Sequence, residues 1–412
     1  MERSPRRSRT NSHASDFSLS VLVACLFVST IANATPHTTA WRFKVLYAFS
    51  GGTDGAYPQG ELTHDAANNI YGTTAGGGGN CPGFGCGTIF KIDANGQETV
   101  LYRFLGGADG AWPTGALVRD ATGVIYGTTY GGGADCTDEG CGTVFKLDKT
   151  LKKTVLHRFI GIDGDGPTSG LIMDARGSLY GTTLAGGIYN QGTVFEIDKR
   201  GKLSVLHSFS FWVDGACPCS SLHVDSSGNL YGVTFDGGGG EGAVFKLSKT
   251  DNETVLYAFS GTNGDGRYPN AGLSEDNDGN LYGATAAGGA RGDNGTIFEV
   301  KRKGGESIMY SFKGSPDGSA PDGLLRDTIG NFYGTTSVGG KGGCSYGCGT
   351  VFRLDQNGTE TVLHRFTGGG DGATPYAGLA VDNKALYGTT FFGGAYNHCN
   401  QGCGVIFKIV PQ

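Results

Sequence analysis

Seven aspartates could carry acid–base chemistry, but they recur once in each copy of a repeating unit. Each precedes a tight turn, where an aspartate side chain bonds backbone N–H groups. A catalytic pair needs two carboxylates held at one place in different environments, whereas this pattern spreads equivalent carboxylates along the chain. We therefore expect a structural turn role for Asp65, Asp120, Asp174, Asp225, Asp276, Asp327 and Asp382.

The histidines do not complete a catalytic triad, which needs a nucleophile, a base and an orienting group held together. Three of them occupy a strand position that is tyrosine in other copies, so we expect packing roles for His157, His207 and His364. The segment 163–166 (Asp-Gly-Asp-Gly) lacks the alternating acidic ligands of a calcium loop. The sequence therefore predicts no catalytic residue, no metal and no cofactor.

Eight cysteines form four close pairs, all in loops that three other copies have in shorter form. In an exported protein such pairs predict local disulfides, and zinc held by two neighbouring pairs is the alternative. The one-residue spacing of Cys217 and Cys219 is poor for a disulfide, and we assign these two no role. The expected disulfides are Cys81–Cys86, Cys136–Cys141, Cys344–Cys348 and Cys399–Cys403.

Residues 1–34 have the pattern of a secretory signal: a basic start, an apolar run at Val21–Ile31 and an Ala-Asn-Ala cleavage motif at 32–34. We expect residues 35–44 to be a leader and the protein to be secreted or periplasmic. Lipoprotein attachment at Cys25 is the less favoured alternative, because the apolar run continues past it. No later stretch predicts a transmembrane helix.

The charge distribution limits the classes of binding partner. The formal net charge is −6 and no block of basic residues occurs, which argues against nucleic acid as a partner. We expect a monomer.

The strands that position any site can be predicted from a sequence motif that occurs seven times. Tyr-Gly-x-Thr recurs at intervals of 51 to 55 residues, a period typical of propellers, solenoids and arrays. Each copy holds four short segments rich in β-branched and aromatic residues, bounded by Gly, Asn and Asp. The tyrosines are Tyr71, Tyr126, Tyr180, Tyr231, Tyr282, Tyr333 and Tyr387.

Four antiparallel strands per copy predict an all-β, seven-bladed β-propeller over residues 45–412. We call the strands a, b, c and d in chain order. The last copy lacks strand d, whereas residues 45–49 provide a spare strand d before the first copy. We expect strand 45–49 to pair with strand 404–409 and close the ring, an arrangement that an open solenoid would not need.

One face of the ring should carry the d–a and b–c loops, which are rich in aromatic residues. Flat rings on stiff loops suit stacking on the apolar faces of sugars or gripping peptides, although packing between blades is an equal alternative for those that precede proline. Because the cysteine loops belong to copies 6, 7, 1 and 2, we expect them to form one continuous wall. The candidate ligand-binding residues are Tyr57, Trp112, Tyr268, Phe84, Tyr130, Tyr346, Phe391 and Tyr396.

The repeat resembles the GloVer tandem repeat, which defines the "choice-of-anchor" group of exported bacterial proteins. The segments 222–234 and 254–259 carry the resemblance, and it extends over about residues 45–412. It implies export and a surface or extracellular location, and it supplies no established activity or catalytic residues.

Three functions are consistent with these patterns. The first is a non-catalytic binding propeller that recognises a glycan or an extracellular protein on the d–a/b–c loop face. The second is an enzyme acting on a polysaccharide or small molecule at the channel mouth, which a cluster of His, Tyr, Arg or acidic residues breaking the repeat symmetry there would favour. The third is a structural module of the cell envelope.

Overall fold

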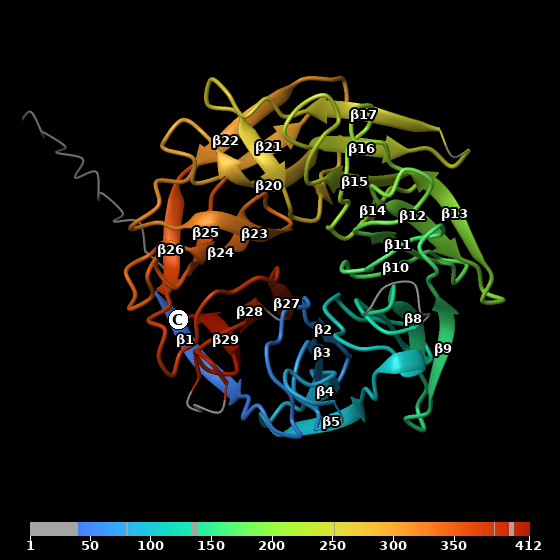
Figure 1. Cartoon of the computed structure of the whole chain (residues 1–412). Coiled ribbons are helices and arrows are strands. Elements are labelled where there is room, and N and C mark those ends of the chain that lie inside the picture. The colour runs from blue at the N-terminus through green and yellow to red at the C-terminus, as the bar shows by residue number, and fades with distance from the viewer. Residues whose placement is uncertain (1–39, 80, 134–138, 251, 383, 395–398) are drawn as a thin grey trace, which may run out of the picture. The chain divides into compact units, whose positions relative to one another are not determined.

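The computed structural model describes residues 40–412, apart from residues 80, 134–138, 251, 383 and 395–398. The described residues form seven sheets around a common axis, each running from an inner strand to an outer strand (Figure 1). This confirms the predicted seven-bladed β-propeller. Within the same residues there is no α-helix, and one short 3-10 helix, η1, spans Gly107–Asp109. The predicted signal and Cys25 lie outside the described residues.

The strands are two to eight residues long, and consecutive strands pair antiparallel within each blade. Blade 1 has β2 (Thr63–His64), β3 (Ile70–Thr74), β4 (Thr88–Ile92) and β5 (Glu98–Arg103); blade 2 has β6 (Val118–Arg119), β7 (Ile125–Thr129), β8 (Thr143–Leu147) and β9 (Lys153–Arg158); blade 3 has β10 (Ile172–Met173), β11 (Leu179–Thr183), β12 (Thr193–Ile197) and β13 (Leu203–Ser208); blade 4 has β14 (His223–Val224), β15 (Leu230–Thr234), β16 (Ala243–Leu247) and β17 (Glu253–Ala258).

The other three blades follow the same plan, with a divided inner strand in blade 5. Blade 5 has β18 (Gly266–Pro269) and β19 (Ser274–Glu275), which both pair with β20 (Leu281–Gly288), then β21 (Thr296–Val300) and β22 (Glu306–Ser311); blade 6 has β23 (Ser319–Arg326), β24 (Phe332–Val338), β25 (Thr350–Leu354) and β26 (Glu360–Arg365); blade 7 has β27 (Ala380–Asp382), β28 (Ala385–Thr390), β29 (Val405–Pro411) and, as its outer strand, β1 (Trp41–Ala48).

The two ends of the described chain close the ring in blade 7. Strand β1 pairs antiparallel with β29, with Val45 opposite Phe407 and Ala48 opposite Val405. The predicted closure is therefore correct, but the strand starts earlier than expected. Residues 41–44, which the sequence assigned to a leader, continue the ladder to a pair between Trp41 and Pro411. Strand β1 thus provides the strand d that the seventh copy lacks.

The glycine of Tyr-Gly-x-Thr is required by packing inside the blade. A methyl group at Gly72 would lie 2.6 Å from Phe90 Cζ and 2.8 Å from Leu62 Cδ2, closer than real side chains approach. Two threonines that face each other across strands b and c complete the motif, with Thr74 Oγ1 and Thr88 Oγ1 2.9 Å apart. The repeat therefore encodes one tightly packed hairpin per blade.

Neighbouring blades are joined by a ring of phenylalanine pairs. In each blade the phenylalanine that follows strand d is buried and meets the strand-c phenylalanine of the next blade. Phe49 of blade 7, for example, lies edge-on to Phe90 of blade 1 at 5.2 Å, and Phe209 of blade 3 lies edge-on to Phe245 of blade 4 at 5.0 Å. The hydrophobic core is thus spread over the seven seams between blades.

A backbone hydrogen bond also crosses each seam, at the residue before proline in the d–a loop. Tyr57 N donates to Cys403 O at 2.9 Å and Trp112 N to Cys86 O at 3.0 Å. These residues have φ near +60°, a left-handed conformation that non-glycine residues rarely adopt. The seven residues at this position are Tyr57, Trp112, Gly166, Cys217, Tyr268, Ala320 and Thr374.

The repeated polar residues are hydrogen-bonded into turns and loops. Asp65 Oδ1 accepts from the N–H groups of Ala67 and Asn69, both at 3.0 Å. The same bonds are present at Asp120, Asp174, Asp225, Asp276 and Asp327. Asp382 ends strand β27 and adjoins residue 383, which is not described.

Disulfides link Cys81 to Cys86, Cys344 to Cys348 and Cys399 to Cys403. Cys136, the partner expected for Cys141, lies outside the described residues. The three disulfides belong to b–c loops of blades 1, 6 and 7, which closure makes consecutive in the ring.

Candidate functional site

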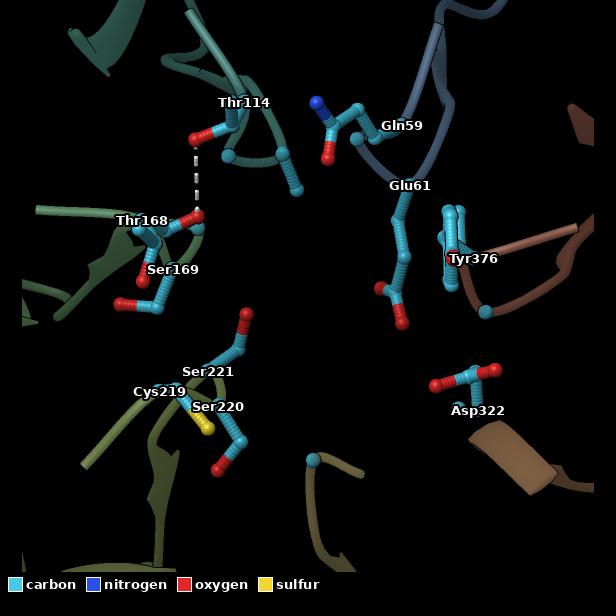
Figure 2. A pocket seen from close by; sticks show the side chains of 18 of the residues that line it. Gln59, Glu61, Thr114, Thr168, Ser169, Cys219, Ser220, Ser221, Asp322 and Tyr376 are labelled. Carbon is cyan, nitrogen blue, oxygen red and sulfur yellow. Dashed lines mark hydrogen bonds between the residues drawn. The ribbon is translucent and has the colours of Figure 1, made fainter. Parts of the chain in front are cut away.

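The inner ends of the seven d–a loops surround a cavity of about 120 Å³ on the channel axis (Figure 2). Every blade contributes the residue that follows the loop proline. Unlike the residues of the repeated motif, this position differs in type from nearly every blade to the next. Its occupants are Gln59, Thr114, Thr168, Cys219, Asn270, Asp322 and Tyr376.

Glu61 breaks the repeat most strongly. It directly precedes the leucine of strand a, where the other six blades have Ala, Gly or Ser. Its side chain reaches into the channel (Figure 2) and keeps access to solvent there. A methyl group at Gly378 of blade 7 would overlap Glu61 Oε1, so the glycine leaves the space that the carboxylate occupies. The surrounding loops displace part of the water around the Glu61 carboxyl group, and this desolvation raises its pKa.

Asp322 faces the same cavity from blade 6 (Figure 2). Asn270 Nδ2 of blade 5 donates to Asp322 Oδ1 at 2.6 Å. Burial raises the pKa of Asp322 to about 7, against the opposing effect of hydrogen bonds from Ser337 and Asn270. Asp322 can thus change its charge near neutral pH, which is what acid–base chemistry at that pH requires.

Tyr376 lines the cavity from blade 7 and starts a row of aromatic rings. It is 47% exposed and lies edge-on to Phe391 at 5.6 Å. Phe391 stacks with Tyr57 at 4.9 Å, and Tyr57 stacks parallel to Phe84 at 4.9 Å. We call these four residues the aromatic ledge. Three of them are among the residues expected to bind ligand, and Tyr376 is new.

The other predicted aromatics do not join the ledge. Trp112 donates from Nε1 to Gly85 O at 2.9 Å, and its ring lies 6.4 Å from that of Tyr130. Tyr268 stacks on Phe235 at 5.0 Å. Tyr346 is 84% exposed on the b–c loop of blade 6. Tyr396 lies outside the described residues.

The histidines of the outer strands have structural partners. His157, His207 and His364 each bond the aspartate of the following d–a loop, with Nε2–Oδ2 distances of 2.9, 2.7 and 3.1 Å. Tyrosines make the same contact in other blades, as Tyr47 does with Asp54 at 3.0 Å.

Cys217 and Cys219 are free thiols. Cys217 occupies the left-handed position before proline, and Cys219 lines the cavity. Burial raises the pKa of the Cys219 thiol to about 12, so it is protonated at neutral pH and a weak nucleophile.

Among the described residues that line the cavity there is no Lys, Arg or His. The described part of the chain also contains no group of three His, Cys, Asp or Glu arranged to hold a metal, and none of its helices is long and apolar enough to cross a membrane. The site thus consists of two carboxyl groups, two amides, a thiol, hydroxyls and an adjoining row of aromatic rings.

The fold and this site define a seven-bladed propeller with a polar axial pocket. The Gloeobacter/Verrucomicrobia repeat matches residues 29–241 and 223–412. The chain belongs to that repeat family, which confirms the resemblance seen in the sequence. No curated protein matches the chain.

Solved structures share the architecture. A streptogramin B lyase superimposes with a TM-score of 0.61 at 15% identity, over 90% of this chain and 98% of that one. A catalytically inactive virginiamycin B lyase variant from Staphylococcus aureus, with quinupristin, gives 0.60 at 14% identity, over 90% and 100%. The extracellular domain of a one-component system from B. thetaiotaomicron gives 0.56 at 14%, over 90% and 42%. At these identities the likeness is one of fold.

Proposed function

We propose that this protein is an exported binding propeller that takes a polyhydroxylated ligand, such as the end of a glycan, at the channel mouth on the d–a/b–c loop face. The observation that carries the proposal is the aromatic ledge, which adjoins the axial pocket where the repeat breaks down. Glu61 occupies a position that holds a small residue in the other blades. Asp322 of blade 6 and Tyr376 of blade 7 line the same cavity.

The chemistry of the pocket suits a sugar. An aromatic ring stacks on the apolar C–H face of a pyranose, and Tyr376 and Phe84 are the exposed ends of the ledge. Carboxyl and amide groups bond hydroxyls, and Glu61, Asp322, Gln59 and Asn270 all line the cavity. A cavity of about 120 Å³ has the volume of roughly four waters. We therefore expect one sugar substituent to enter the channel while the ring lies against the ledge.

Export is supported by the three disulfides, which persist in oxidising compartments, and by the secretory pattern of residues 1–34. This would place the loop face outside the cytoplasm, where glycans are available.

An enzyme is the second candidate, and one observation favours it. The pKa of Asp322 is about 7, and Glu61 shares the same cavity. Two carboxyl groups of different surroundings in one pocket can divide the roles of acid and base. Release of a product from a bound glycan would establish this candidate and replace the simple binding role.

The test is a glycan-binding screen with the purified protein, reading retention and product release together. We expect retention of at least one glycan, with Tyr376→Ala weakening it about tenfold or more. Gly378→Ala should also weaken binding, because the added methyl group displaces the Glu61 carboxylate.

The matched control is Tyr346→Ala, which removes an exposed aromatic outside the cavity lining and should leave binding unchanged. Retention that depends on Tyr346 rather than on Tyr376 would move the site to the disulfide loops. A protein that retains no glycan would refute the proposal and leave the structural role in front.

A further inference from the structure

One position of the outer strands places an acidic residue against another acidic residue in four of the seven seams. This position lies on strand d, in the seam between two blades. It is next to the aspartate of the d–a loop that leads into the same blade. In sequence order from blade 7 its occupants are Phe43, Glu98, Lys153, Leu203, Glu253, Glu306 and Glu360. We call Glu98, Glu253, Glu306 and Glu360 the seam glutamates.

Blade 2 shows which atoms this position meets. Lys153 is 2% exposed, and its Nζ donates to both the backbone oxygen and Oδ1 of Asp109, the latter at 2.9 Å. A lysine there supplies donors to a site made of acceptors. In blade 7 the same position holds Phe43, which stacks on His364 at 3.7 Å.

A glutamate at the same position lies near hydrogen-bond acceptors of the d–a loop. It can donate a hydrogen bond only when its carboxyl group is protonated. Oε1 of all four seam glutamates is buried and has no hydrogen-bond partner. The loop aspartates already accept from other groups: Asp54 from Tyr47 Oη at 3.0 Å and from Ser50 N at 2.8 Å, and Asp317 from Tyr310 Oη at 2.6 Å. The same buried oxygen lacks a protein partner in four separate blades, and a proton on the carboxyl group would supply a donor at each of these places.

We propose that the seam glutamates are neutral carboxylic acids in the folded protein, so that their protons provide hydrogen-bond donors in four seams of the ring. Ionisation of the glutamates as the pH rises through about 7 loosens those seams. In blade 2 the amino group of Lys153 supplies the donor instead. This inference is independent of the proposed function, because none of these residues lines the channel cavity.

The surroundings of each seam glutamate favour its neutral form. Burial is the first cause that raises the pKa of every seam glutamate, to about 7, and the loop aspartate is the second. Asp54 faces Glu98, Asp214 faces Glu253, Asp265 faces Glu306 and Asp317 faces Glu360. The opposing cations are Arg103 at Glu98, His207 at Glu253, and Lys313 and Arg365 at Glu360.

The direction of the pH dependence follows from these values. In the unfolded chain a glutamate has a pKa of about 4.3, below its folded value. The stability contributed by the neutral acids is therefore complete below pH 4.3 and is lost progressively as the pH rises to about 7. Unfolding near pH 6 must release protons.

The test compares the wild type with the quadruple variant E98Q/E253Q/E306Q/E360Q. Glutamine keeps the shape and offers a neutral donor, so the fold should be retained. From the pH dependence of the unfolding free energy, the wild type should release about 3.5 more protons than the variant on unfolding near pH 6. The melting temperature of the variant should fall less between pH 5 and 8.

Single Glu→Gln variants provide the same measurement if the quadruple variant does not fold, each removing about one proton from the count. Glu98→Leu is the control for the hydrogen bond, because leucine cannot donate and should be less stable than Glu98→Gln at pH 5. Equal proton release by wild type and quadruple variant would overturn the proposal. So would glutamine variants that are destabilised equally at every pH.

Discussion

Phe49 provides the sharpest test of ring closure, because it belongs to the blade that both chain ends build. It is fully buried, lies edge-on to Phe90 of blade 1 at 5.2 Å, and its N–H donates to Gly404 O at 3.1 Å. Phe209 has the same surroundings in the continuous part of the chain. It is fully buried, lies 5.0 Å from Phe245 and donates to Gly192 O at 3.0 Å.

Truncation of either phenylalanine side chain should lower the free energy of unfolding by the same amount. Removing a buried phenylalanine side chain destabilises a protein by about 3–5 kcal/mol, of which the edge-on aromatic pair accounts for about 0.5–1.5 kcal/mol. A closed ring makes the seam between blades 7 and 1 equivalent to the seam between blades 3 and 4. We therefore expect Phe49→Ala and Phe209→Ala to lower the free energy of unfolding by values within about 1 kcal/mol of each other.

The assay is denaturant unfolding followed by tryptophan fluorescence, for which the chain has three tryptophans. If Phe49→Ala cost less than about 1 kcal/mol while Phe209→Ala showed the full loss, blade 7 would not be closed by β1. That result would refute the closure.

Three further predictions concern the loops and the channel. Replacing both Cys344 and Cys348 by serine opens a loop with a sequence separation of 4, so it should lower stability by only about 2 kcal/mol in the chain-entropy model, measured by denaturant unfolding; a much larger loss would mean that the disulfide holds the blade. Ala320 has a φ of 52°, where an L-residue is strained by about 1–2 kcal/mol. Ala320→Gly should therefore raise stability by about 0.5–1 kcal/mol after the entropic cost of glycine, and a loss in the melting temperature would contradict this. Ionised Asp322 accepts hydrogen bonds from hydroxyls, so affinity for a retained glycan should rise as the pH increases through about 7, the pKa of that residue. Asp322→Asn should abolish the pH dependence in a titration from pH 5 to 9, and an unchanged profile would remove Asp322 from the site.

The fold could be predicted from the sequence because the repeated motif marks the same position in every blade. Seven copies of Tyr-Gly-x-Thr with a displaced strand d specify both the number of blades and the closure. The early start of β1 could not be predicted this way, because residues 41–44 belong to no repeat and gain their partners only from Lys408–Pro411 at the other end of the chain.

The site was harder to predict, for a physical reason. Trp112 and Tyr268 were candidates because they are aromatic, but the position they occupy is defined by its left-handed backbone and its seam hydrogen bond. Cys217, Ala320 and Thr374 adopt the same conformation. The type of side chain at this position therefore does not report its role.

A signal for the channel was nevertheless present in the sequence. Glu61 stands where the other copies have Ala, Gly or Ser, and the residue after the loop proline varies throughout. Alignment of the seven copies with attention to where they differ, rather than where they agree, would have found Glu61 and Asp322. It would not have shown that Gly378 makes room for Glu61, because that contact joins blades 7 and 1 across the closure.

The central claim is that ligand binds at the channel mouth, and carboxyl footprinting tests it most directly. Glu61 is open to channel solvent, so a carbodiimide with an amine should label it, and mass spectrometry reads the extent. Glu139, an exposed carboxylate on the b–c loop of blade 2, is the internal control. Binding at the channel mouth predicts that a retained glycan protects Glu61 severalfold and leaves the labelling of Glu139 unchanged. Saturating glycan with undiminished labelling of Glu61 would contradict it.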